Sequence, residues 1–405
     1  MGTHNNGHYP RRNDEIFAHI VGWGMAVPEQ ILTNNDLEAI VETTDEWIWT
    51  RTGIRERRIA GEHESTATLG LKAAQKALEV ANVLPLEVDL VIVATSTPEH
   101  IFPSTASKIQ DWLGATKAGA FDLSAACAGF VYAVNMAAQS IRSGSIQTAV
   151  VIGSETMSRV MDWQDRGTCV LFGDGAGAVV LKASKVDGGV RSSVLRSDGS
   201  GWDVLAIPTV GSRDNLQPEA NPHELKMHKM YMNGREVYRF ATRIVGESIT
   251  QALELANLTV KDLALIVPHQ ANLRIIQSAA RSLGVETDIF MSNLERYGNT
   301  SAASIPIALC EAIDAGRVKP GQHIALCGFG GGLAWAAMVL TWTGPETVDP
   351  RKLVRQRQQL SYAGARWRRQ AARWSRRVDA IVNRIRPERG RLQRLRHKVD
   401  NQRFD

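Results

Sequence analysis

Three side chains of this sequence are of types that carry out nucleophilic chemistry, and they lie far apart along the chain: Cys127, His269 and Asn299. A cysteine thiolate is a nucleophile, a histidine moves protons, and an asparagine donates hydrogen bonds without titrating. Each of the three stands beside a short apolar run, among small or polar residues. They predict a catalytic site if the fold brings them together.

Cys127 lies in a run of very small residues, Ser-Ala-Ala-Cys-Ala-Gly, which leaves its sulfur approachable. An apolar, helix-like segment follows. If Cys127 opens that helix, unpaired backbone N–H groups and the helix dipole favour its thiolate. The alternative is an inert buried cysteine, since free cysteine is among the most buried residue types.

His269 and Asn299 lie at predicted junctions between strands and helices. His269 directly follows the buried run 263–268, and Asn299 lies in Arg-Tyr-Gly-Asn-Thr-Ser-Ala-Ala, before a helix. Ligands of open α/β sheets gather beyond the carboxyl ends of the strands. Alone, the histidine would be structural and the asparagine a helix cap. A Cys, a His and an Asn at three such junctions of one core indicate a catalytic site instead.

A glycine-rich segment, Gly-Phe-Gly-Gly-Gly at 328–332, completes the set. Glycines let backbone N–H groups approach a ligand closely, and we predict an oxyanion hole formed by the N–H groups of Gly330 and Cys127. The alternative is a tight turn or a packed strand crossing. A second glycine-rich segment, 173–177, lacks the spacing of a dinucleotide-binding loop and leads into a strand-like run.

Short apolar runs alternate with helical segments from Ile16 to about Thr343, which predicts an α/β architecture. The predicted strands cover 88–95, 148–153, 263–268 and 323–327, and the predicted helices cover 66–81, 104–113, 237–255 and 272–283.

The α/β region contains an internal repeat. Ala-Leu-Glu-Val-Ala-Asn-Val in its first half parallels Ala-Leu-Glu-Leu-Ala-Asn-Leu in its second. Ser-Ala-Ala-Cys, which ends at Cys127, parallels Ser-Ala-Ala-Ser, which ends at Ser304, so we predict that Ser304 is the counterpart of Cys127. The chain therefore divides into a disordered lead at 1–15, a half with the nucleophile at 16–185, a half with the histidine and asparagine at 186–345, and a tail at 346–405.

The composition is that of a globular protein with a sizeable core: 44% of the 405 residues are hydrophobic and 22% are charged. The four cysteines show no C-x-x-C spacing, which argues against a disulfide framework or a zinc site and suits a reducing compartment. The polar lead lacks the apolar run of a secretory signal. The sequence has no stretch of about 18 uncharged apolar residues, so no membrane-spanning helix is predicted and we expect a cytoplasmic protein.

Positive charge is concentrated in the tail. Residues 346–405 contain 18 Lys/Arg and 6 Asp/Glu, a net charge of +12, whereas the rest of the chain has 29 basic and 36 acidic residues. Gly364, Pro387 and Gly390 are expected to break any single long helix. The tail therefore differs from the rest of the chain in its charge composition, and we consider it separately.

Residues 365–386 have the apolar spacing of an amphipathic helix, with Trp367 and Trp374 among the apolar positions. A basic helix with tryptophan can lie on an anionic membrane, hold nucleic acid by its phosphates, or bind an acidic protein. The alternative, which we favour from sequence, is a solvated or poorly ordered appendage.

Five segments together resemble β-ketoacyl-acyl carrier protein synthase III, the initiating condensing enzyme of type II fatty acid synthesis. They are SAACAGF around Cys127, VPHQANLRII around His269, ERYGNTSAASIP around Asn299, GFGGGLAW around Gly330, and TDEWIWTRTGIRER at 44–57. The resemblance covers about residues 16–343. It implies a thiolase-like fold, in which duplicated βα halves form a layered α-β-α-β-α core, here with a basic C-terminal extension.

The resemblance implies a Cys127–His269–Asn299 triad and a reaction in two steps. An acyl-CoA passes its acyl group to Cys127; malonyl-acyl carrier protein then decarboxylates, and its enolate attacks the acyl-cysteine to give a β-ketoacyl product. Negative charge builds on the thioester oxygen, so His269 and Asn299 serve best there as neutral donors. No metal or redox cofactor is implied.

The resemblance also implies substrate contacts. The positions that match CoA contacts of the family are Thr43, Trp47, Arg51, Arg166, Gly234, Asn272 and Arg274. Trp47 can stack on adenine with Arg166 as a cation–π partner, and Arg51 and Arg274 can meet phosphates. Residues expected at the acyl pocket are Phe102, Leu171 and Phe329, of which Phe102 reaches across a homodimer. Candidates for docking the acidic carrier protein are Arg239, Arg274 and Arg281.

Other functions compete with condensation. The nearest is a plain acyltransferase that passes the acyl group from Cys127 to an alcohol or amine. Asn299 favours condensation, because the enolate step needs a second donor beside His269. 3-Hydroxy-3-methylglutaryl-CoA synthase and plant-type polyketide synthases share the fold but fit the motifs less well. A nucleic-acid-binding or membrane-associated scaffold built on the tail would leave the three side chains unexplained.

Overall fold

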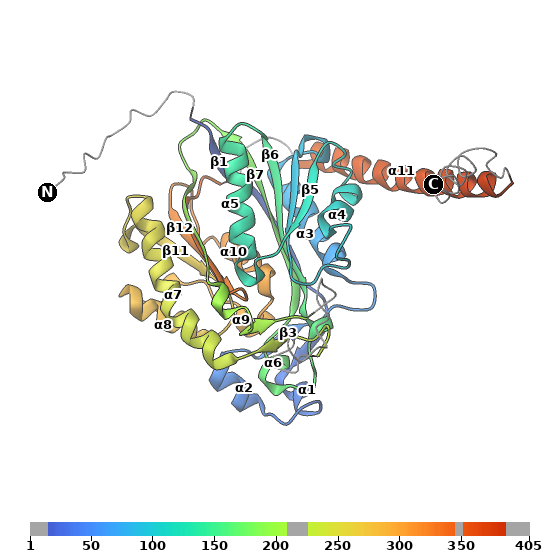
Figure 1. Ribbon diagram of the computed structural model, residues 1–405. Helices are drawn as coiled ribbons and strands as arrows, with labels where there is room; N and C mark the ends of the chain where they lie inside the picture. The colour runs from blue at the N-terminus through green and yellow to red at the C-terminus, as the bar shows by residue number, and fades with distance from the viewer. Residues whose placement is uncertain (1–14, 209–225, 345–350, 386–405) are drawn as a thin grey trace, which may run out of the picture.

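The computed structural model describes residues 15–208, 226–344 and 351–385, and two β-sheets form its centre (Figure 1). The first sheet has the strand order β1-β7-β6-β4-β5. β4 is parallel to both β5 and β6, whereas β6, β7 and β1 are antiparallel to one another in turn. Its strands are β1 (Phe17–Ala26), β4 (Leu90–Ala94), β5 (Gly119–Leu123), β6 (Thr148–Thr156) and β7 (Asp174–Ser184).

The second sheet repeats this pattern in the order β11-β12-β13-β8. β11 is parallel to β12, and β12, β13 and β8 are antiparallel in turn, as β4, β6, β7 and β1 are in the first sheet. The strands are β8 (Gly189–Ser197), β11 (Leu263–Pro268), β12 (His323–Gly330) and β13 (Ala334–Thr341). The duplicated α/β architecture predicted from the sequence is therefore confirmed.

Helices lie between the sheets and on both outer faces, in the order α-β-α-β-α (Figure 1). Both sheets are buried on both faces, so their strands alternate between two cores. In β4, Ile92 and Ala94 face the central core, whereas Val91 and Val93 face the outer one. The central helices are α5 (Gly129–Arg142) and α10 (Ser304–Asp314), and the outer helices are α3 (Thr66–Ala81), α4 (Thr105–Leu113), α7 (Gly234–Leu255) and α8 (Leu273–Leu283).

The outer helices begin and end at residues that suit their caps. Ser65 caps the start of α3 and Ser104 caps the start of α4, each accepting a backbone N–H three residues on. Asn82 and Gly114 end these helices in the left-handed region. Short elements at one end of the core are α1 (Asn34–Glu38), α2 (Asp45–Thr52), α6 (Arg166–Cys169), α9 (Leu294–Tyr297), β2 (Ile31–Thr33), β3 (Glu56–Arg58), β9 (Leu205–Ala206) and β10 (Tyr231–Met232).

All eight predicted strands and helices are present, and several are longer than predicted. β6 continues to Thr156 and β12 to Gly330, because β6 is buried throughout and β12 is buried from Ile324 onward. α7 begins at Gly234, where Asn233 accepts the N–H of Glu236. The glycine-rich segment 173–177 leads into β7 and not into a helix, as predicted.

The predicted counterpart of Cys127 is wrong by two residues. A 3₁₀ turn precedes each central helix, Ala126–Ala128 before α5 and Ser301–Ala303 before α10. The first residue of each turn is left-handed, with φ of 45° at Ala126 and 49° at Ser301. Backbone geometry therefore pairs Cys127 with Ala302. Aligning the two motifs by their shared Ser-Ala-Ala sequence gave a pairing that is shifted by two residues from the structural one.

The tail contains a continuous helix, α11 (Arg351–Ile385), so the expected break at Gly364 is wrong. Glycine weakens a helix interior by only about 1 kcal/mol, and packing on either side of Gly364 outweighs that. Gln358 and Ala365 are buried against α3 and α4. Residues 1–14 of the lead predicted at 1–15 lie outside the described residues, as do the expected breaks at Pro387 and Gly390. None of the described helices combines enough length with enough apolar character to cross a bilayer.

Gln358 anchors α11, since its side-chain amide donates to the carbonyl oxygens of Leu78 at 2.9 Å and Val83 at 2.8 Å. We predict that Gln358→Ala lowers the stability of the docked helix by about 1–3 kcal/mol, the usual net value of two hydrogen bonds. Hydrogen exchange within 355–369 should accelerate. Gln359→Ala, at an exposed neighbouring position, is the control, and equal exchange in both variants would contradict the anchoring role.

Candidate active site

Cys127 lies at the buried start of α5, in the 3₁₀ turn that runs directly into that helix. Its side chain is only 5% exposed, and it lines a cavity of about 960 Å³. The preceding Ala126 adopts a left-handed conformation that non-glycine residues rarely take. This strained turn sets Cys127 at the wall of the cavity, which is its route to a substrate.

The surroundings of Cys127 do not favour the thiolate that was predicted. Burial raises the pKa of the thiol from about 9 to about 12; a hydrogen bond to Ser301 lowers it, and the charge of Glu155 raises it again. That rise corresponds to about 4 kcal/mol, whereas a helix start contributes about 0.3–2 kcal/mol to a charged group. Burial therefore opposes the thiolate that the helix start favours, and desolvation is the larger of the two effects.

The end of β12 passes directly against the Cys127 turn. A Cβ atom on Gly330 would lie 2.8 Å from the backbone nitrogen of Cys127 and 3.1 Å from its Cβ. Only glycine fits so close an approach. Gly330 and Cys127 both line the cavity, so the two backbone segments predicted to form an oxyanion hole lie side by side.

His269 follows β11 and is 2% exposed. Its backbone N–H donates to the carbonyl of Cys327 at 2.7 Å, and its ring packs edge-on against Phe329. Burial lowers the pKa of the imidazole to about 3, so the ring is neutral at physiological pH. A neutral ring suits the predicted role as a hydrogen-bond donor.

Ser304, the first residue of α10, fixes the orientation of His269. Its hydroxyl lies 2.6 Å from Nδ1 of the imidazole and also accepts the N–H of Gln270 at 3.4 Å. When the Ser304 hydroxyl donates its hydrogen bond to Nδ1, that nitrogen is the acceptor of the neutral ring. The other ring nitrogen, Nε2, then carries the hydrogen and is the donor. Ser304 therefore supports the histidine.

Asn299 is held where the two halves of the chain cross. Its backbone N–H donates to the carbonyl of Leu171 at 2.8 Å, and its carbonyl accepts from Gly173 at 3.0 Å. Gly298 has a φ of 61°, and a Cβ there would lie 2.6 Å from the carbonyl oxygen of Leu171. The side-chain oxygen of Asn299 accepts the N–H of Ser301 at 2.8 Å, which leaves the amide nitrogen, a pure donor, as the end available to a ligand.

Ser301 and Glu155 belong to this site but were not predicted. The thiol of Cys127 donates to the hydroxyl of Ser301 at 3.4 Å, and Ser301 also bonds to Glu155. The Glu155 carboxylate is fully buried, and burial raises its pKa. No ion pair to it is found within the described residues. Its acceptors are satisfied instead by the N–H of Ser96 at 3.0 Å and by the hydroxyls of Thr95 and Thr97.

Glu155 stands at the carboxyl end of β6 in the apolar run Thr-Ala-Val-Val-Ile-Gly-Ser-Glu-Thr. A lone carboxylate at the end of a buried strand is the one signal in the sequence that could have identified it. Ser301 lay within a quoted motif, but only the left-handed turn of the backbone shows that it faces the nucleophile.

Apolar side chains form much of the cavity wall. Leu171 and Phe329, two of the predicted acyl-pocket residues, line it together with Met157, Leu205, Ile207, Met230 and Met232. Phe102 does not line it. That side chain is 85% exposed on the surface of the single chain, while its neighbour Ile101 reaches the cavity.

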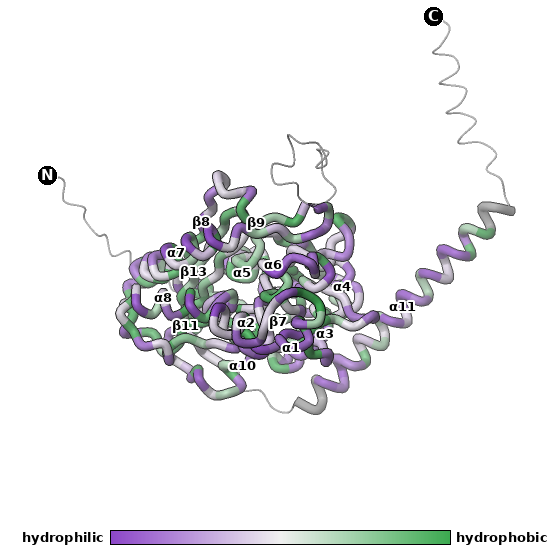
Figure 2. Tube along the Cα trace, turned by 90° about the horizontal axis from the view of Figure 1, so that it is seen from below, coloured by the Kyte–Doolittle hydropathy of each residue, from purple (hydrophilic) through white to green (hydrophobic). Residues whose placement is uncertain are grey.

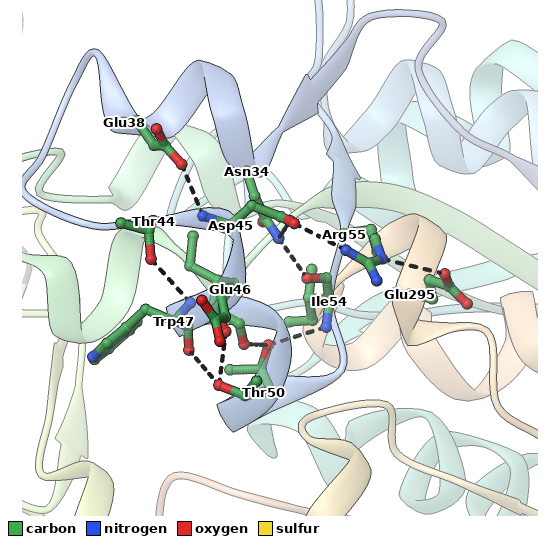
Figure 3. Close-up of polar contacts among 12 residues, drawn as sticks. Asn34, Glu38, Thr44, Asp45, Glu46, Trp47, Thr50, Ile54, Arg55 and Glu295 are labelled. Atoms are coloured by element: carbon green, nitrogen blue, oxygen red, sulfur yellow. Dashed lines mark hydrogen bonds and ion pairs between the residues drawn. The ribbon is translucent and has the colours of Figure 1, made fainter.

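Trp47 and the helix α2 are held firmly at one end of the core. Asp45, at the start of α2, is bound from three sides: its N–H donates to Glu38, and its carboxylate accepts from Asn34 and Arg55 (Figure 3). Thr44 caps the helix through the N–H of Trp47. The indole ring is therefore presented from a rigid element.

Two guanidinium groups lie over the Trp47 indole, Arg166 at 4.7 Å and Arg51 at 4.5 Å from the ring centroid. The predicted cation–π pairing of Trp47 with Arg166 is therefore present. Arg51, which was predicted to meet a phosphate, also stacks on the ring. The contacts of these residues with a ligand stay predictions.

The other candidate CoA contacts gather between α2 and the starts of α7 and α8. Asn272 caps α8 and donates to the carbonyl of Arg51 at 3.0 Å, and Arg274 donates to the carbonyl of Thr50 at 2.8 Å. Gly234 is the first residue of α7 and lines the cavity together with Asn272. The hydroxyl of Thr43 is buried and has no hydrogen-bond partner within the described chain.

Arg239, Arg274 and Arg281 are exposed on α7 and α8, the outer helices of the second sheet. They are accessible to a protein partner, and their role in carrier docking stays a prediction. Across residues 15–208, 226–344 and 351–385, no group of three or more His, Cys, Asp or Glu side chains has an arrangement that could hold a metal ion.

Comparison with known proteins gives matches along most of the chain. The family model described as 3-Oxoacyl-[acyl-carrier-protein (ACP)] synthase III matches residues 121–199, and that of its C terminal part matches residues 253–342. A β-ketoacyl-[acyl-carrier-protein] synthase III of Roseiflexus sp. (strain RS-1) is 51% identical over 327 residues, which are 81% of this chain and 99% of the relative. That of Symbiobacterium thermophilum is 52% identical over 323 residues, 80% of this chain and 97% of the relative.

A solved structure of β-ketoacyl-[acyl carrier protein] synthase III from Thermus thermophilus has a TM-score of 0.76 and 47% sequence identity. The match covers 80% of this chain and 99% of that one. These three proteins are thus matched almost from end to end, whereas about a fifth of this chain has no counterpart in them. α11 lies beyond residue 342, where the family match ends.

A raised thiol pKa has a direct consequence for the reactivity of Cys127. We predict that its alkylation by iodoacetamide accelerates about tenfold per pH unit from pH 7 to 9.5 without a plateau, because the thiolate fraction keeps rising below a pKa of about 12. Intact-protein mass spectrometry follows the adduct, with Cys127→Ser as the control. A plateau below pH 8 would show a resting thiolate and contradict the account.

Proposed function

The chain belongs to the β-ketoacyl-[acyl-carrier-protein] synthase III family of condensing acyltransferases, and from this we propose that it joins an acyl-CoA primer to malonyl-acyl carrier protein. The product is a β-ketoacyl-acyl carrier protein, the first elongated intermediate of type II fatty acid synthesis. One observation carries the proposal. Cys127, His269, Asn299 and Gly330, from both halves of the chain, line one cavity.

In the first half-reaction, the sulfur of Cys127 attacks the thioester carbon of the acyl-CoA. The Cys127 and Gly330 N–H groups stabilise the oxyanion, the bond from carbon to the CoA sulfur breaks, and the acyl-cysteine forms. The thiol proton leaves through Ser301, whose hydroxyl accepts its hydrogen bond in the resting structure, and ends on the departing CoA thiolate. Acylation therefore needs no net proton donor, which suits a protonated resting thiol.

In the second half-reaction, the bond between the malonyl carboxylate and its methylene carbon breaks and releases CO₂. The electron pair becomes an enolate whose oxygen accepts hydrogen bonds from Nε2 of His269 and the amide nitrogen of Asn299. The enolate carbon attacks the acyl-cysteine, and the Cys127 thiolate leaves and takes up one proton. The low imidazole pKa supports this assignment, because a histidine that stays neutral neither quenches the carbanion nor loses its N–H.

Substrate delivery follows the surface between α2, α7 and α8. We propose that the adenine of CoA stacks on Trp47 beside Arg166, that Arg51 and Arg274 contact its phosphates, and that Thr43, Gly234 and Asn272 line its path. The primer occupies the apolar part of the cavity at Leu171 and Phe329. The acidic carrier protein docks on Arg239, Arg274 and Arg281. No metal or redox cofactor takes part.

We further propose a homodimer in the cytoplasm, in which Phe102 contributes to the partner's acyl pocket. Its exposure of 85% next to Ile101 at 67% supports this, because adjoining exposed apolar side chains mark interaction sites. A plain acyltransferase on the same scaffold is the competing activity. It would share the acylation step but would not need the donor at Asn299.

The two half-reactions can be separated at Asn299. We predict that Asn299→Asp acylates Cys127 within a few-fold of the wild-type rate but loses condensation by about 10²–10³-fold. Aspartate keeps an oxygen for the Ser301 N–H and replaces the donating amide with a second acceptor. Acylation is read by mass spectrometry and condensation by β-ketoacyl product formation, both at pH 8.

Asn257→Asp, which makes the same charge change at an exposed position after α7, is the matched control. Asn299→Asp with full condensation would remove the enolate role of Asn299. A wild-type acyl-enzyme that malonyl-acyl carrier protein leaves intact, while an alcohol or amine discharges it, would instead establish the plain acyltransferase.

A further inference from the structure

The helix α11 is docked on the core along its first half and stands free along its second half. Gln358 and Ala365 are buried, Arg355 pairs with Glu79 at 3.3 Å, and Arg369 pairs with Asp111 at 3.7 Å. Every described side chain from 370 to 381 is exposed. The expected loose appendage is therefore wrong for the docked half, which fixes the direction of the free half (Figure 1).

The face of α11 that points away from the core carries a continuous apolar stripe. Leu360, Trp367, Trp374 and Ile381 recur every seven residues, and their exposed fractions are 72%, 75%, 67% and 57%. Val378, at 50%, lies beside them. The stripe is about 32 Å long at 1.5 Å per residue. A helix with such a stripe normally buries it against another surface.

Arginines flank the stripe on both sides. Helical geometry places Arg366, Arg373 and Arg377 along one edge and Arg357 and Arg368 along the other. Residues 355–381 contain eight arginines and one acidic residue, Asp379. Figure 2 shows the resulting alternation of hydrophilic and hydrophobic residues along α11 as it leaves the core. Like charges three and four residues apart destabilise a helix unless an anionic surface offsets them.

The arginines and the apolar stripe together indicate which kind of partner covers this helix: a second copy of α11, nucleic acid or a lipid bilayer. A second copy of α11 would bring arginines against arginines with Asp379 as the one acidic residue between 355 and 381, and these charges oppose such a pair even though Gly364, Ala371 and Val378 would complete an apolar seam beside the stripe. Nucleic acid would satisfy the arginines but leave the tryptophans and aliphatic side chains in water. An anionic lipid bilayer satisfies both, with tryptophan at the headgroup level and arginine at the lipid phosphates.

We propose that α11 lies in the plane of an anionic lipid bilayer and attaches the enzyme to it, with Trp367, Trp374 and Ile381 inserted below the headgroups. Because the docked half of α11 is anchored by Gln358, the attachment holds the whole core beside the bilayer. The proposal stands apart from the condensation chemistry, since none of these residues lines the catalytic cavity.

Flotation of the full-length protein with extruded vesicles tests the proposal. We expect at least tenfold stronger partitioning into vesicles with three parts phosphatidylglycerol to seven parts phosphatidylcholine than into pure phosphatidylcholine. Trp367→Ala/Trp374→Ala should weaken partitioning at least tenfold, and 0.5 M salt should weaken it as well. Trp202→Ala, at a tryptophan that is 57% exposed elsewhere on the surface, is the matched control and should partition like the wild type.

Circular dichroism and condensing activity of the double variant in solution should equal those of the wild type, which excludes a folding defect. The proposal is overturned if the wild-type protein floats with neither vesicle, or if the double variant floats as well as the wild type. Retention on DNA without flotation would assign the helix to nucleic acid. A fall in oligomeric state in the double variant, again without flotation, would assign the stripe to a second copy of the chain.

Discussion

The starts of two buried helices, α5 and α10, meet between the sheets, and the rest of the structure depends on how closely they pack there. The turn before α10 lies so near β6 that a Cβ on Gly153 would stand 2.2 Å from the carbonyl oxygen of Ala302. The end of β12 also approaches the turn before α5 closely, since a Cβ on Gly330 would stand 2.8 Å from the backbone nitrogen of Cys127. Glu155 joins the two regions by accepting from the loop after β4 and from Ser301. Small shifts in any of these contacts would separate the nucleophile from its donors.

Duplication explains how one chain supplies both sets of groups. Each half builds the same left-handed turn at the start of its central helix, and the residues at matching positions have taken different tasks. The first half places a thiol at the second residue of the turn. The second half places alanine there and uses Ser301 and Ser304 to orient the groups around that thiol. Both turns also point the partial positive charge of a helix start toward the same small volume.

Much of the fold could be predicted from the sequence, because buried strands and amphipathic helices leave strong periodic patterns. The convergence of Cys127, His269 and Asn299 was also predictable, since each follows or precedes an element whose end must face the site. The protonation of Cys127 was not predictable, because it depends on how far the folded chain excludes water from the sulfur. The same holds for Glu155, whose partners come from two separate segments, the loop after β4 and the turn before α10.

Two residues, Gly364 in the tail and Arg51 on α2, show where predictions from residue type alone fail. Gly364 predicts a break, but the helix continues because distant groups on α3 and α4 fill one of its faces. Arg51 likewise has the right charge for a phosphate, yet its guanidinium stacks on Trp47 together with Arg166. In both cases the residue type was judged correctly in isolation, and a packing contact decided the structure: with distant segments for Gly364, and with Trp47, four residues away on α2, for Arg51.

The most direct test of the account is intact-protein mass spectrometry of the enzyme mixed with a panel of acyl-CoAs and then with malonyl-acyl carrier protein. The account predicts a mass increase of one acyl group on the wild type, none on Cys127→Ala, and loss of that mass as the β-ketoacyl-acyl carrier protein appears. An equal adduct on Cys127→Ala, or no adduct with any acyl-CoA, would contradict the assignment of Cys127 as the nucleophile at the meeting point of the two helices.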